Sequence, residues 1–359
     1  NTAPPMRNNI ISRLLGRHKN TDSHSAISPQ PMNSLQSINT TGSSPIYQDW
    51  YEFSSSTQKW SCVDTTSSKH LLPTSHDTNL TLATWNIDAG ESFSELRTSA
   101  ILSHLSNLTP LPDIIFLQEV SRPSLSFLLG DERIRKDWFS SEMDSKNWAG
   151  QNFATMTLLS KARFSEGARI GLVWRVKYKS KYGRDALCCD IFLPPPNPGL
   201  ASGEEGETRV RLVNVHLDSL GIVPSYRPGQ LSTVASSLRI AGRGLVAGDF
   251  NPVLPEDKTL VEENGLVDAW QELKQAEDGF TWGIDGKQAY PPIRMDKVAL
   301  LGLVVRDIEV MDPGTVVDPG RRDDLRGIGG GPAQDTEQRG GRLVPWSDHS
   351  GLRCTFGLA

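Results

Sequence analysis

The sequence of 359 residues lacks an apolar run of about eighteen residues, the length that a membrane-spanning helix needs, so we expect no membrane span. It has only four cysteines, none of them in C-x-x-C spacing, and two of them, Cys188 and Cys189, are adjacent. This pattern argues against a disulfide framework or a zinc site. It favours an intracellular protein, nuclear or cytoplasmic.

An excess of positive charge is also missing, because the formal net charge is -5. A protein whose affinity comes from coating a long duplex should be basic. Any contact with nucleic acid is therefore expected to be local, such as a chain end held in a pocket. The alternative is a small phosphorylated substrate. Nothing in the sequence indicates an obligate protein partner.

Residues 1–76 have few apolar residues in a periodic pattern and are rich in Ser, Thr, Asn, Gln and Pro, which predicts a disordered or loosely docked N-terminal tail. Residues 6–19 have the composition of a basic amphipathic helix that resembles an organelle-targeting peptide, and an untargeted basic tail is the alternative. Because the sequence begins at Asn1 rather than at a methionine, it is open whether further residues precede it. Large rings seldom stay in water, so we expect one aromatic cluster to pack onto the domain as an outer strand or strap: Tyr47, Trp50, Tyr51, Phe53 and Trp60.

Residues 77–359 are expected to form one folded domain in which strands outnumber helices. Helical spacing occurs at 96–108, 231–240 and 265–273. Strand patterns occur at 80–85, 113–117, 154–159, 170–178, 186–193, 209–215, 245–247, 294–301 and 352–356. Two stretches interrupt this series as loops, 194–208 and 312–345. Because alternating and continuous apolar patterns are mixed, we predict an α/β fold of two packed mixed sheets with helices outside.

Polar side chains follow the expected strands at the points where they end. In Gly248-Asp249-Phe250-Asn251 the two polar side chains alternate around Phe250, so both point to the same side while the chain is extended. Taken alone, this tetrapeptide is equally typical of a turn with a self-bonded aspartate. The same device recurs along the chain, at Asn86 and Asp88, Glu119, His216 and Ser219, Asp296, and Asp348 and His349.

These residue types suit phosphoester chemistry around a hard cation. Carboxylate and amide oxygens without cysteine are the ligands that Mg²⁺ or Mn²⁺ prefers. In-line attack on phosphorus needs charge neutralisation and a held water more than it needs covalent catalysis. Of the three histidines in the expected domain, His216 and His349 lie in these motifs. Structural roles are the alternatives, with Asp296 pairing with Arg294, and with Ser219 and Asp88 as turn or helix caps.

Six of these segments, in chain order, resemble the motif series of the endonuclease/exonuclease/phosphatase superfamily. They are Trp-Asn-Ile-Asp at 85–88, Leu-Gln-Glu at 117–119, Asn-Val-His-Leu-Asp-Ser at 214–219, Gly-Asp-Phe-Asn at 248–251, Arg-Met-Asp at 294–296 and Ser-Asp-His at 347–349. The first and third of them, with Thr281-Trp282, are most similar to the tyrosyl-DNA phosphodiesterase type 2 branch. The resemblance covers about residues 80–357. It implies a DNase I-like, four-layered α/β sandwich with the site at one edge of the paired sheets.

The resemblance also implies a role for each residue. The metal would be held by Glu119, with Asn86 and Asp348 close to the metal or its waters. Asp249 would orient or deprotonate the attacking water, and Asn251 would hold that water. Phosphate would accept hydrogen bonds from His216 and Ser219, and the transition state would be stabilised by His349, oriented by Asp296. Trp282 would form an apolar wall of the pocket.

The activity implied is that of a Mg²⁺-dependent phosphodiesterase, with Mn²⁺ as an alternative cofactor. The first choice of substrate is a DNA 5′ end, as in 5′-tyrosyl-DNA phosphodiester cleavage. The alternatives are a small-molecule or lipid phosphodiesterase or phosphatase of the same superfamily, and a catalytically retired phosphate-binding member. Two positions depart from the branch, because Val253 stands where it has an arginine and Ser350 where it often has a tryptophan. Loss of an arginine that contacts phosphate would weaken binding of a DNA end.

Overall fold

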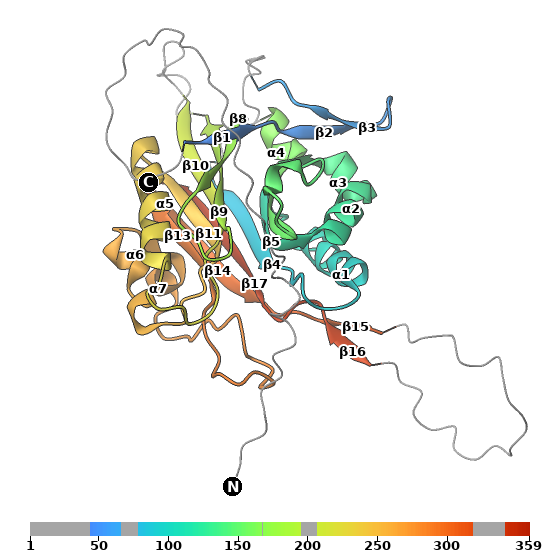
Figure 1. Ribbon diagram of the computed structural model, residues 1–359. Coiled ribbons are helices and arrows are strands. Elements are labelled where there is room, and N and C mark those ends of the chain that lie inside the picture. The colour runs from blue at the N-terminus through green and yellow to red at the C-terminus, as the bar shows by residue number, and fades with distance from the viewer. Residues whose placement is uncertain (1–43, 66–77, 167, 195–206, 319–341) are drawn as a thin grey trace, which may run out of the picture. The chain divides into compact units, whose positions relative to one another are not determined.

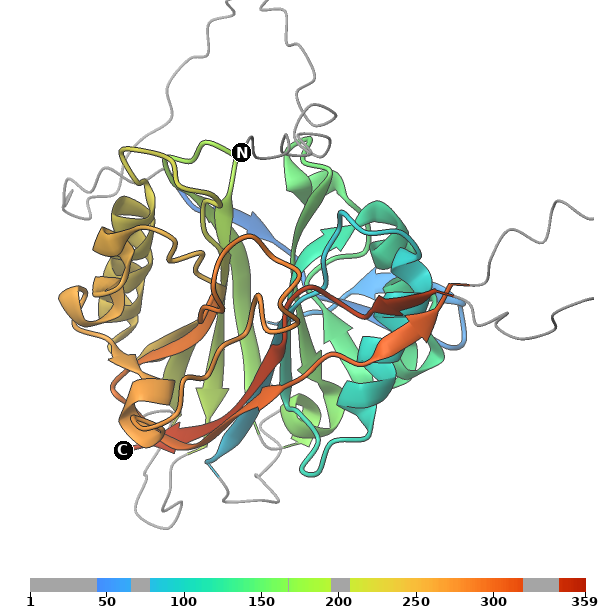
Figure 2. The same cartoon turned by 90° about the horizontal axis from the view of Figure 1, so that it is seen from below.

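Two mixed β-sheets are packed face to face, with helices on their outer faces, in the computed structural model, which describes residues 44–65, 78–166, 168–194, 207–318 and 342–359 (Figures 1 and 2). In sheet order, the seven-stranded sheet consists of β1 (Ile46–Gln48), β8 (Arg169–Lys177), β9 (Asp185–Leu193), β10 (Thr208–His216), β11 (Gly244–Asp249), β13 (Asp296–Leu301) and β12 (Val267–Asp268). The eight-stranded sheet consists of β14 (Leu303–Met311), β17 (Gly351–Leu358), β4 (Leu80–Asn86), β5 (Ile114–Ser121), β7 (Phe153–Ser160), β6 (Trp138–Ser140), β2 (Tyr51–Ser54) and β3 (Lys59–Cys62).

Helices form the two outer layers. Those beside the eight-stranded sheet are α1 (Ser94–Ser106), α2 (Arg122–Gly130) and α3 (Glu132–Asp137), and those beside the seven-stranded sheet are α5 (Arg227–Ala241) and α6 (Leu260–Glu263) (Figure 1). The short α7 (Ala269–Leu273) contacts β13 and β14, one strand from each sheet, and buries Ala269 and Trp270 in the core between them. The short α4 (Lys161–Glu166) connects β7 to β8, and two single 3₁₀ turns lie at Lys146–Trp148 and Pro255–Asp257. The predicted four-layered α/β sandwich is confirmed.

The apolar pattern explains the layering. On α5 the buried residues Leu231, Val234 and Leu238 recur at helical spacing, and Gly242 ends the helix in the left-handed conformation. Strand β11 is apolar on both faces, because Leu245 packs into the core between the sheets while Val246 packs under α5. Burial on both faces makes these strands read as continuous apolar runs in the sequence.

Strand register brings the motif residues to one edge of the sandwich. Strands β10 and β11 run parallel, with His216 opposite Asp249, and β13 runs antiparallel to β11, with Asp296 opposite the same Asp249. In the other sheet, β4 and β5 run parallel, with Asn86 opposite Gln118. Because both parallel pairs end at these residues, their polar side chains gather where the two sheets meet.

The strand that carries Glu119 runs further than predicted. We expected it to end at residue 117, but β5 continues to Ser121 through an irregularity in its pairing with β7 between Leu117 and Val120. At this bulge Glu119 has a φ of 56°, a left-handed conformation that is uncommon for any residue except glycine. The bulge turns the Glu119 side chain toward the edge where the motif residues meet.

The aromatic segment near the N-terminus connects the two sheets. Strand β1 pairs with β8 in one sheet, and β2 pairs with β6 and β3 in the other. Between them, the buried indole of Trp50 donates a hydrogen bond to the Gly171 carbonyl at 3.0 Å. Residues 46–62 therefore form the strap that the aromatic cluster predicted. The amphipathic stretch 6–19 lies outside the described residues, and so does most of the 194–208 loop.

Two stretches of secondary structure differ from the prediction. The helix expected at 265–273 is shorter, because residues 267–268 form β12 and the Asp268 carboxylate caps α7 by accepting from the Trp270 and Gln271 amides. The stretch 312–345 is not wholly a loop, since its two ends pair as β15 (Thr315–Val317) and β16 (Leu343–Pro345). Residues 319–341 lie outside the described residues. The sequence patterns also gave no indication of β14, α2 or α3.

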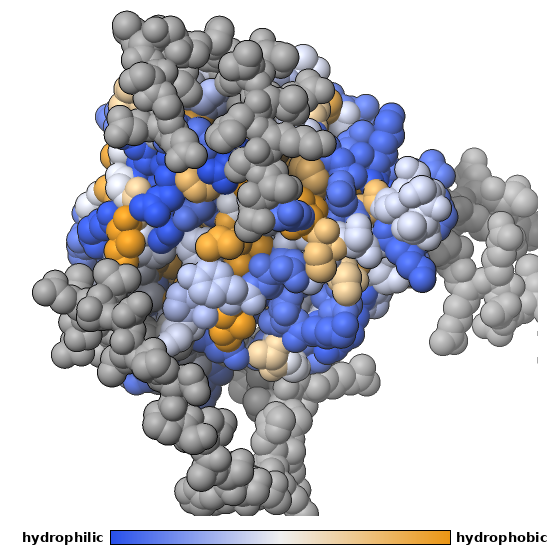
Figure 3. Space-filling model, turned by 90° about the horizontal axis from the view of Figure 1, so that it is seen from above, coloured by the Kyte–Doolittle hydropathy of each residue, from blue (hydrophilic) through white to orange (hydrophobic). Residues whose placement is uncertain are grey.

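A membrane-spanning helix requires a long run of hydrophobic side chains. On the face shown in Figure 3, hydrophobic side chains lie in small groups among hydrophilic ones. Within the described ranges, no helix has both the length and the apolar content needed to cross a bilayer.

A buried polar contact joins the sheets beneath the site edge. Gln118 of β5 donates from Nε2 to Oδ1 of Asn214 on β10 at 2.8 Å, and Asn214 donates to the carbonyl oxygens of Leu117 and Met156. Both amides are fully buried. Gly248 lies in the narrow space beside this contact, with a φ of 132°. A Cβ there would overlap the Val215 carbonyl oxygen and lie 3.1 Å from Nε2 of Gln118.

We expect Gly248→Ala to lower the free energy of unfolding by roughly 3 kcal/mol, because it adds backbone strain and an overlap with the Val215 carbonyl of the adjacent strand. Urea unfolding followed by circular dichroism measures this value. Gly229→Ala is the matched control, since a Cβ at Gly229 meets nothing within 4 Å in the first turn of α5. That change should be neutral or stabilise by up to about 1 kcal/mol. Equal effects of the two changes would contradict the close approach described above.

Candidate active site

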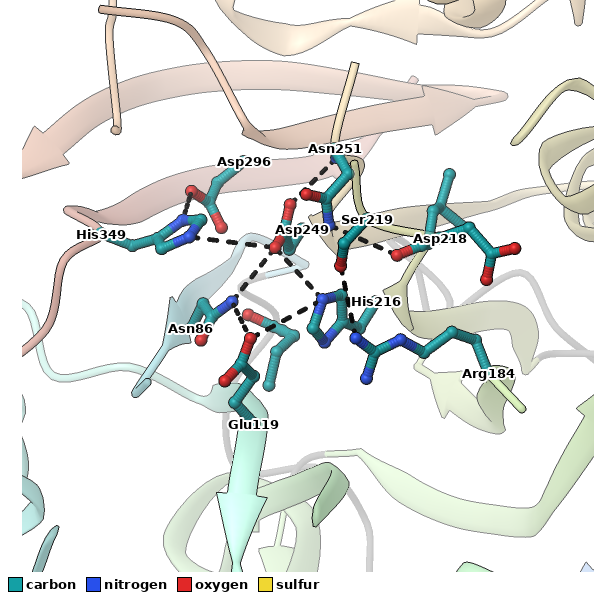
Figure 4. A network of polar contacts seen from close by, with 12 residues as sticks. Asn86, Glu119, Arg184, His216, Asp218, Ser219, Asp249, Asn251, Asp296 and His349 are labelled. Atoms are coloured by element: carbon teal, nitrogen blue, oxygen red, sulfur yellow. Dashed lines mark hydrogen bonds and ion pairs between the residues drawn. The ribbon is translucent and has the colours of Figure 1, made fainter. Parts of the chain in front are cut away.

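The Asp249 carboxylate, at the end of β11, is the centre of the polar network in Figure 4. Its Oδ2 accepts a hydrogen bond from Nδ2 of Asn86 at 3.1 Å and lies 3.4 Å from Nε2 of His216 and 4.0 Å from Nε2 of His349. Its Oδ1 accepts from the amide of Asn251 at 2.9 Å. Burial raises the pKa of Asp249 to about 7, with the nearby Asp296 and Glu119 carboxylates adding to this and the charged His349 opposing it.

His349 is held by a carboxylate behind it. Its Nδ1 lies 2.8 Å from Oδ2 of Asp296, a distance at which the imidazole donates to the carboxylate. Burial lowers the pKa of His349, but the Asp296, Asp348 and Asp249 charges outweigh it and hold the pKa well above the ordinary value. Asp296 does not pair with Arg294, the structural alternative, because Arg294 binds Asp268 at 2.6 Å instead. A charged imidazole with a fixed Nδ1 directs its Nε2 donor toward Asp249.

His216 is in the opposite protonation state. It is buried, and its pKa is lowered well below the ordinary value by burial and by the positive charges of Arg184 and His349. Within the described part of the chain neither ring nitrogen has a hydrogen-bond partner. Its ring stacks on Phe153 at a centroid distance of 6.1 Å. The site therefore places a neutral and a charged imidazole on two sides of one carboxylate, a division typical of acid–base chemistry.

Carboxylates also gather near Asn86, where Glu119 and Asp348 are candidates to bind a cation and Asp88 lies close to both. Glu119 is partly exposed and accepts hydrogen bonds from Asn86 Nδ2 at 3.3 Å and from the Ala89 amide at 2.9 Å. The pKa of Asp88 is raised to about 6 by burial and by the charges of Asp348 and Glu119, with Arg97 opposing them. Negative charge therefore accumulates here beyond what the protein neutralises.

This donor set fits one hard cation. Glu119, Asn86 and Asp348 offer carboxylate and amide oxygens, the ligands that Mg²⁺ or Mn²⁺ prefers. Among the described residues, no group of three or more His, Cys, Asp and Glu side chains is spaced to hold a metal ion. Magnesium usually takes only one or two protein carboxylates and keeps several waters. A bound cation would lower the raised pKa values of the neighbouring carboxyl groups.

The remaining predicted residues lie at the rim. The indole of Trp282 donates from Nε1 to Oδ2 of the exposed Asp348 at 3.2 Å, and its backbone bridges to His349. Ser219 accepts a hydrogen bond from Nη2 of Arg184 at 3.3 Å. Asp88 has a structural role in its turn, where it accepts from the Gly90 amide. The structure thus brings all ten predicted site residues to this edge: Asn86, Glu119, His216, Ser219, Asp249, Asn251, Trp282, Asp296, Asp348 and His349.

Arg184 is a site residue that the sequence patterns did not identify. It lies in the turn before β9, packs its guanidinium 4.8 Å from the Phe153 ring centroid and reaches Ser219 with Nη2 (Figure 4). Arg184 and Phe153, together with Trp148 and His216, line a cavity of about 20 Å³, enough for one water. No strand-end pattern marks this turn. Arg97 of α1, treated below, was missed as well.

Comparison with known proteins identifies the fold. No model of a known family matches the sequence, and no curated protein does. Among solved structures, TDP2 of D. rerio complexed with a single-strand DNA product is 20% identical with a TM-score of 0.55, covering 78% of this chain and 100% of that one. TDP2 of C. elegans is 21% identical with a TM-score of 0.52, covering 78% of this chain and 75% of that one.

A bacterial structure extends the comparison. An endonuclease/exonuclease/phosphatase family protein from Bacteroides thetaiotaomicron is 14% identical with a TM-score of 0.53, covering 79% of this chain and 98% of that one. The chain therefore has the fold of the endonuclease/exonuclease/phosphatase proteins. The resemblance drawn from the six motifs is confirmed at the level of the fold.

We expect Asp296→Asn to lower the pKa of His349, because burial still opposes the charge while the carboxylate that offsets it is gone. Proton NMR titration of the imidazole in metal-free protein measures this pKa. In the wild type the folded-state pKa lies above the ordinary 6.5, so the contribution of His349 to stability is complete below that pH. This stabilisation is lost as the pH rises through the raised pKa of His349. The stability of Asp296→Asn should not show that fall with pH.

Asp190→Asn is the control for that titration. It also removes a buried carboxylate, but one that pairs with Arg211 rather than with a histidine. It should leave the pKa of His349 unchanged. An unchanged pKa in Asp296→Asn would mean that the 2.8 Å contact does not hold the charge on His349.

Proposed function

We propose that this chain is a divalent-metal-dependent phosphodiesterase of the endonuclease/exonuclease/phosphatase superfamily. One observation carries the proposal. The buried Asp249 carboxylate has Asn86, His216 and His349 within 4.0 Å on its Oδ2 side, and Glu119 lies on the far side of Asn86. Burying so many polar groups together costs stability, and a fold has no reason to keep them all without a ligand.

The proposed reaction is hydrolysis by in-line attack of water on phosphorus. A new P–O bond forms to the water oxygen as the P–O bond to the leaving oxygen breaks. Asp249 orients the water and receives its proton. The backbone N–H of Asn251 holds the Asp249 carboxylate in place through a hydrogen bond of 2.9 Å. The leaving oxygen takes a proton from solvent. A bound cation at Glu119 would neutralise charge on a non-bridging phosphate oxygen.

The two imidazoles act as donors to the phosphate. His349 stays charged beside Asp296, so its Nε2–H offers a positive donor to the charge that develops in the transition state. His216 stays neutral and offers Nε2–H from the opposite side of Asp249. Ser219 and Arg184 extend this donor surface outward. Catalysis then rests on positioned charge rather than on a covalent intermediate.

The substrate proposed first is a DNA 5′ end, including a 5′-tyrosyl phosphodiester. The likeness to TDP2, one structure of which contains a single-strand DNA product, supports a nucleic-acid end. The positive charge beside the site is local, from Arg184, which suits a chain end better than a long duplex. A small-molecule or lipid phosphodiester is the second candidate. It is favoured by the apolar Val253 in place of an arginine and by the exposed Leu220 and Val223 in the loop after Ser219.

We expect hydrolysis of a generic phosphodiester to require added Mg²⁺ or Mn²⁺ after chelation. Glu119→Gln and Asp249→Asn should each lower kcat by about 10²–10⁴-fold, because the first weakens the cation site and the second removes the group that orients the water. Steady-state assays with and without EDTA measure both effects. Comparing a 5′-phosphotyrosyl oligonucleotide, an abasic duplex, and inositol and sphingolipid phosphoesters then selects the substrate.

Glu309→Gln is the matched control for Glu119→Gln. Glu309 is an exposed β14 carboxylate that pairs with Arg353, so its loss should leave kcat unchanged. Equal, metal-independent turnover in the wild type and all three variants would contradict the proposal that this site is a metal-dependent phosphodiesterase. Tight binding of a phosphorylated ligand without turnover would instead favour a catalytically retired member.

A further inference from the structure

A fully buried guanidinium lies behind the cation side of the site. Arg97, on the first turn of α1, is 1% exposed. Its Nε donates to the Pro345 carbonyl at 3.1 Å. Its Nη1 donates to the carbonyls of Asp88 at 3.0 Å and Glu91 at 3.4 Å, and its Nη2 donates to the Ile87 carbonyl at 3.1 Å and to Oδ2 of Asp88 at 3.0 Å. All five N–H groups of the guanidinium are therefore used.

Four of these five bonds hold one short loop. Residues 87–91 leave the end of β4, and Asp88 has a φ of 54°, a conformation that costs energy unless its surroundings enforce it. The loop supplies the Ala89 amide that donates to Oε2 of Glu119. It also supplies the Asp88 amide that donates to Oδ1 of Asn86. The loop that Arg97 fixes thus orients both residues of the candidate cation site that come from the eight-stranded sheet.

The fifth bond reaches the segment that carries the other site residues. Pro345 ends β16 and lies three residues before Asp348. Ser347, two residues after Pro345, donates from its hydroxyl to the Asn86 carbonyl at 2.6 Å and accepts from the backbone amide of His349 at 3.0 Å. Arg97 therefore joins the loop behind Glu119 to the segment of Asp348 and His349, although the two lie more than 250 residues apart in sequence.

We propose that Arg97 is a positioning residue for metal binding, and this inference rests on the proposed function. All five of its donors bond to protein oxygens, so it acts through other residues. It holds the Ala89 amide on Glu119 and fixes the distance between Glu119 and Asp348. Lysine cannot replace it, because an ammonium group has three donors and no planar fork with which to reach five acceptors on two segments.

The charge of Arg97 and its hydrogen bonds predict opposite effects of one substitution, Arg97→Met, on metal affinity. Arg97 is a cation near the carboxylates, and it opposes the rise in the pKa of Asp88. If only its charge mattered, Arg97→Met should tighten metal binding, because the variant lacks a positive charge that repels the ion. If its hydrogen bonds matter, the same change should weaken metal binding, because Glu119 and Asp348 lose their fixed spacing.

The test measures Mn²⁺ affinity from the electron paramagnetic resonance signal of the free ion, below the unfolding temperature of each protein. We expect Arg97→Lys and Arg97→Met each to weaken Mn²⁺ binding by about 10–100-fold, the range for residues that orient metal ligands. Arg211→Lys is the matched control, since Arg211 is also a buried guanidinium but pairs with Asp190 and Ser237 at the other end of β10. It should bind Mn²⁺ within about twofold of the wild type.

Amide hydrogen exchange at Ala89 is the second readout, and it needs no metal. We expect exchange to be faster in Arg97→Lys than in the wild type and in Arg211→Lys. Wild-type affinity in Arg97→Lys, or tighter binding in Arg97→Met, would overturn the inference. If the wild type bound no Mn²⁺, the proposed function would fail instead. Exchange at Ala89 would still show whether Arg97 holds the loop, and unchanged exchange would overturn that part as well.

Discussion

The buried contact between the two sheets beside Gly248 is the constraint on which the site depends. Here the Gln118 and Asn214 amides bond across the interface at 2.8 Å, and a Cβ at Gly248 would lie 3.1 Å from Nε2 of Gln118 in the facing sheet. Because both amides are fully buried, each needs the other, and a shift of either sheet would leave an unpaired polar group. The contact therefore fixes the relative position of β4–β5 and β10–β11. Asn86 can then reach Asp249 from the opposite sheet at 3.1 Å.

The buried carboxylates at this edge repel one another, and some of them pair with separate cations. Asp296 is matched by His349, and Asp88 by Arg97. Asp249 has no full counter-charge within hydrogen-bonding distance, and the pKa values of Asp249 and Asp88 are both raised above their ordinary range. Burial is the largest cause of both raised pKa values, so these two carboxyl groups pay the main cost of the buried edge. A cation bound beside Glu119 would offset part of this negative charge, and a bound phosphate could accept the N–H of His216, whose ring nitrogens have no hydrogen-bond partner among the described residues.

The sequence made the strands, the layers and most of the site predictable, because buried strands read as apolar runs and polar residues stand where those runs stop. Register could then be inferred for Asp249 and Asn86, since parallel strands end at one edge. Arg97 could have been noticed from its place four residues before Ile101 on the buried face of α1. Arg184 had no such signal, because a turn residue acquires its partners only when Phe153 and Ser219 arrive from other elements. The left-handed conformation of Glu119 likewise follows from a bulge that no local pattern reveals.

Chemistry and specificity therefore have different origins in this chain. The groups proposed for hydrolysis stand on strand ends or are held by buried residues such as Asp296 and Arg97, so substitutions in the surface loops leave them in place. The groups proposed to select a substrate stand on turns, where Val253 follows Asn251 and Arg184 precedes β9. The positive charge beside Ser219 therefore comes from Arg184 in the β8–β9 turn, whereas Val253 after Asn251 adds none. The exposed, apolar Leu220 and Val223 lie in the loop that directly follows Ser219 in the chain.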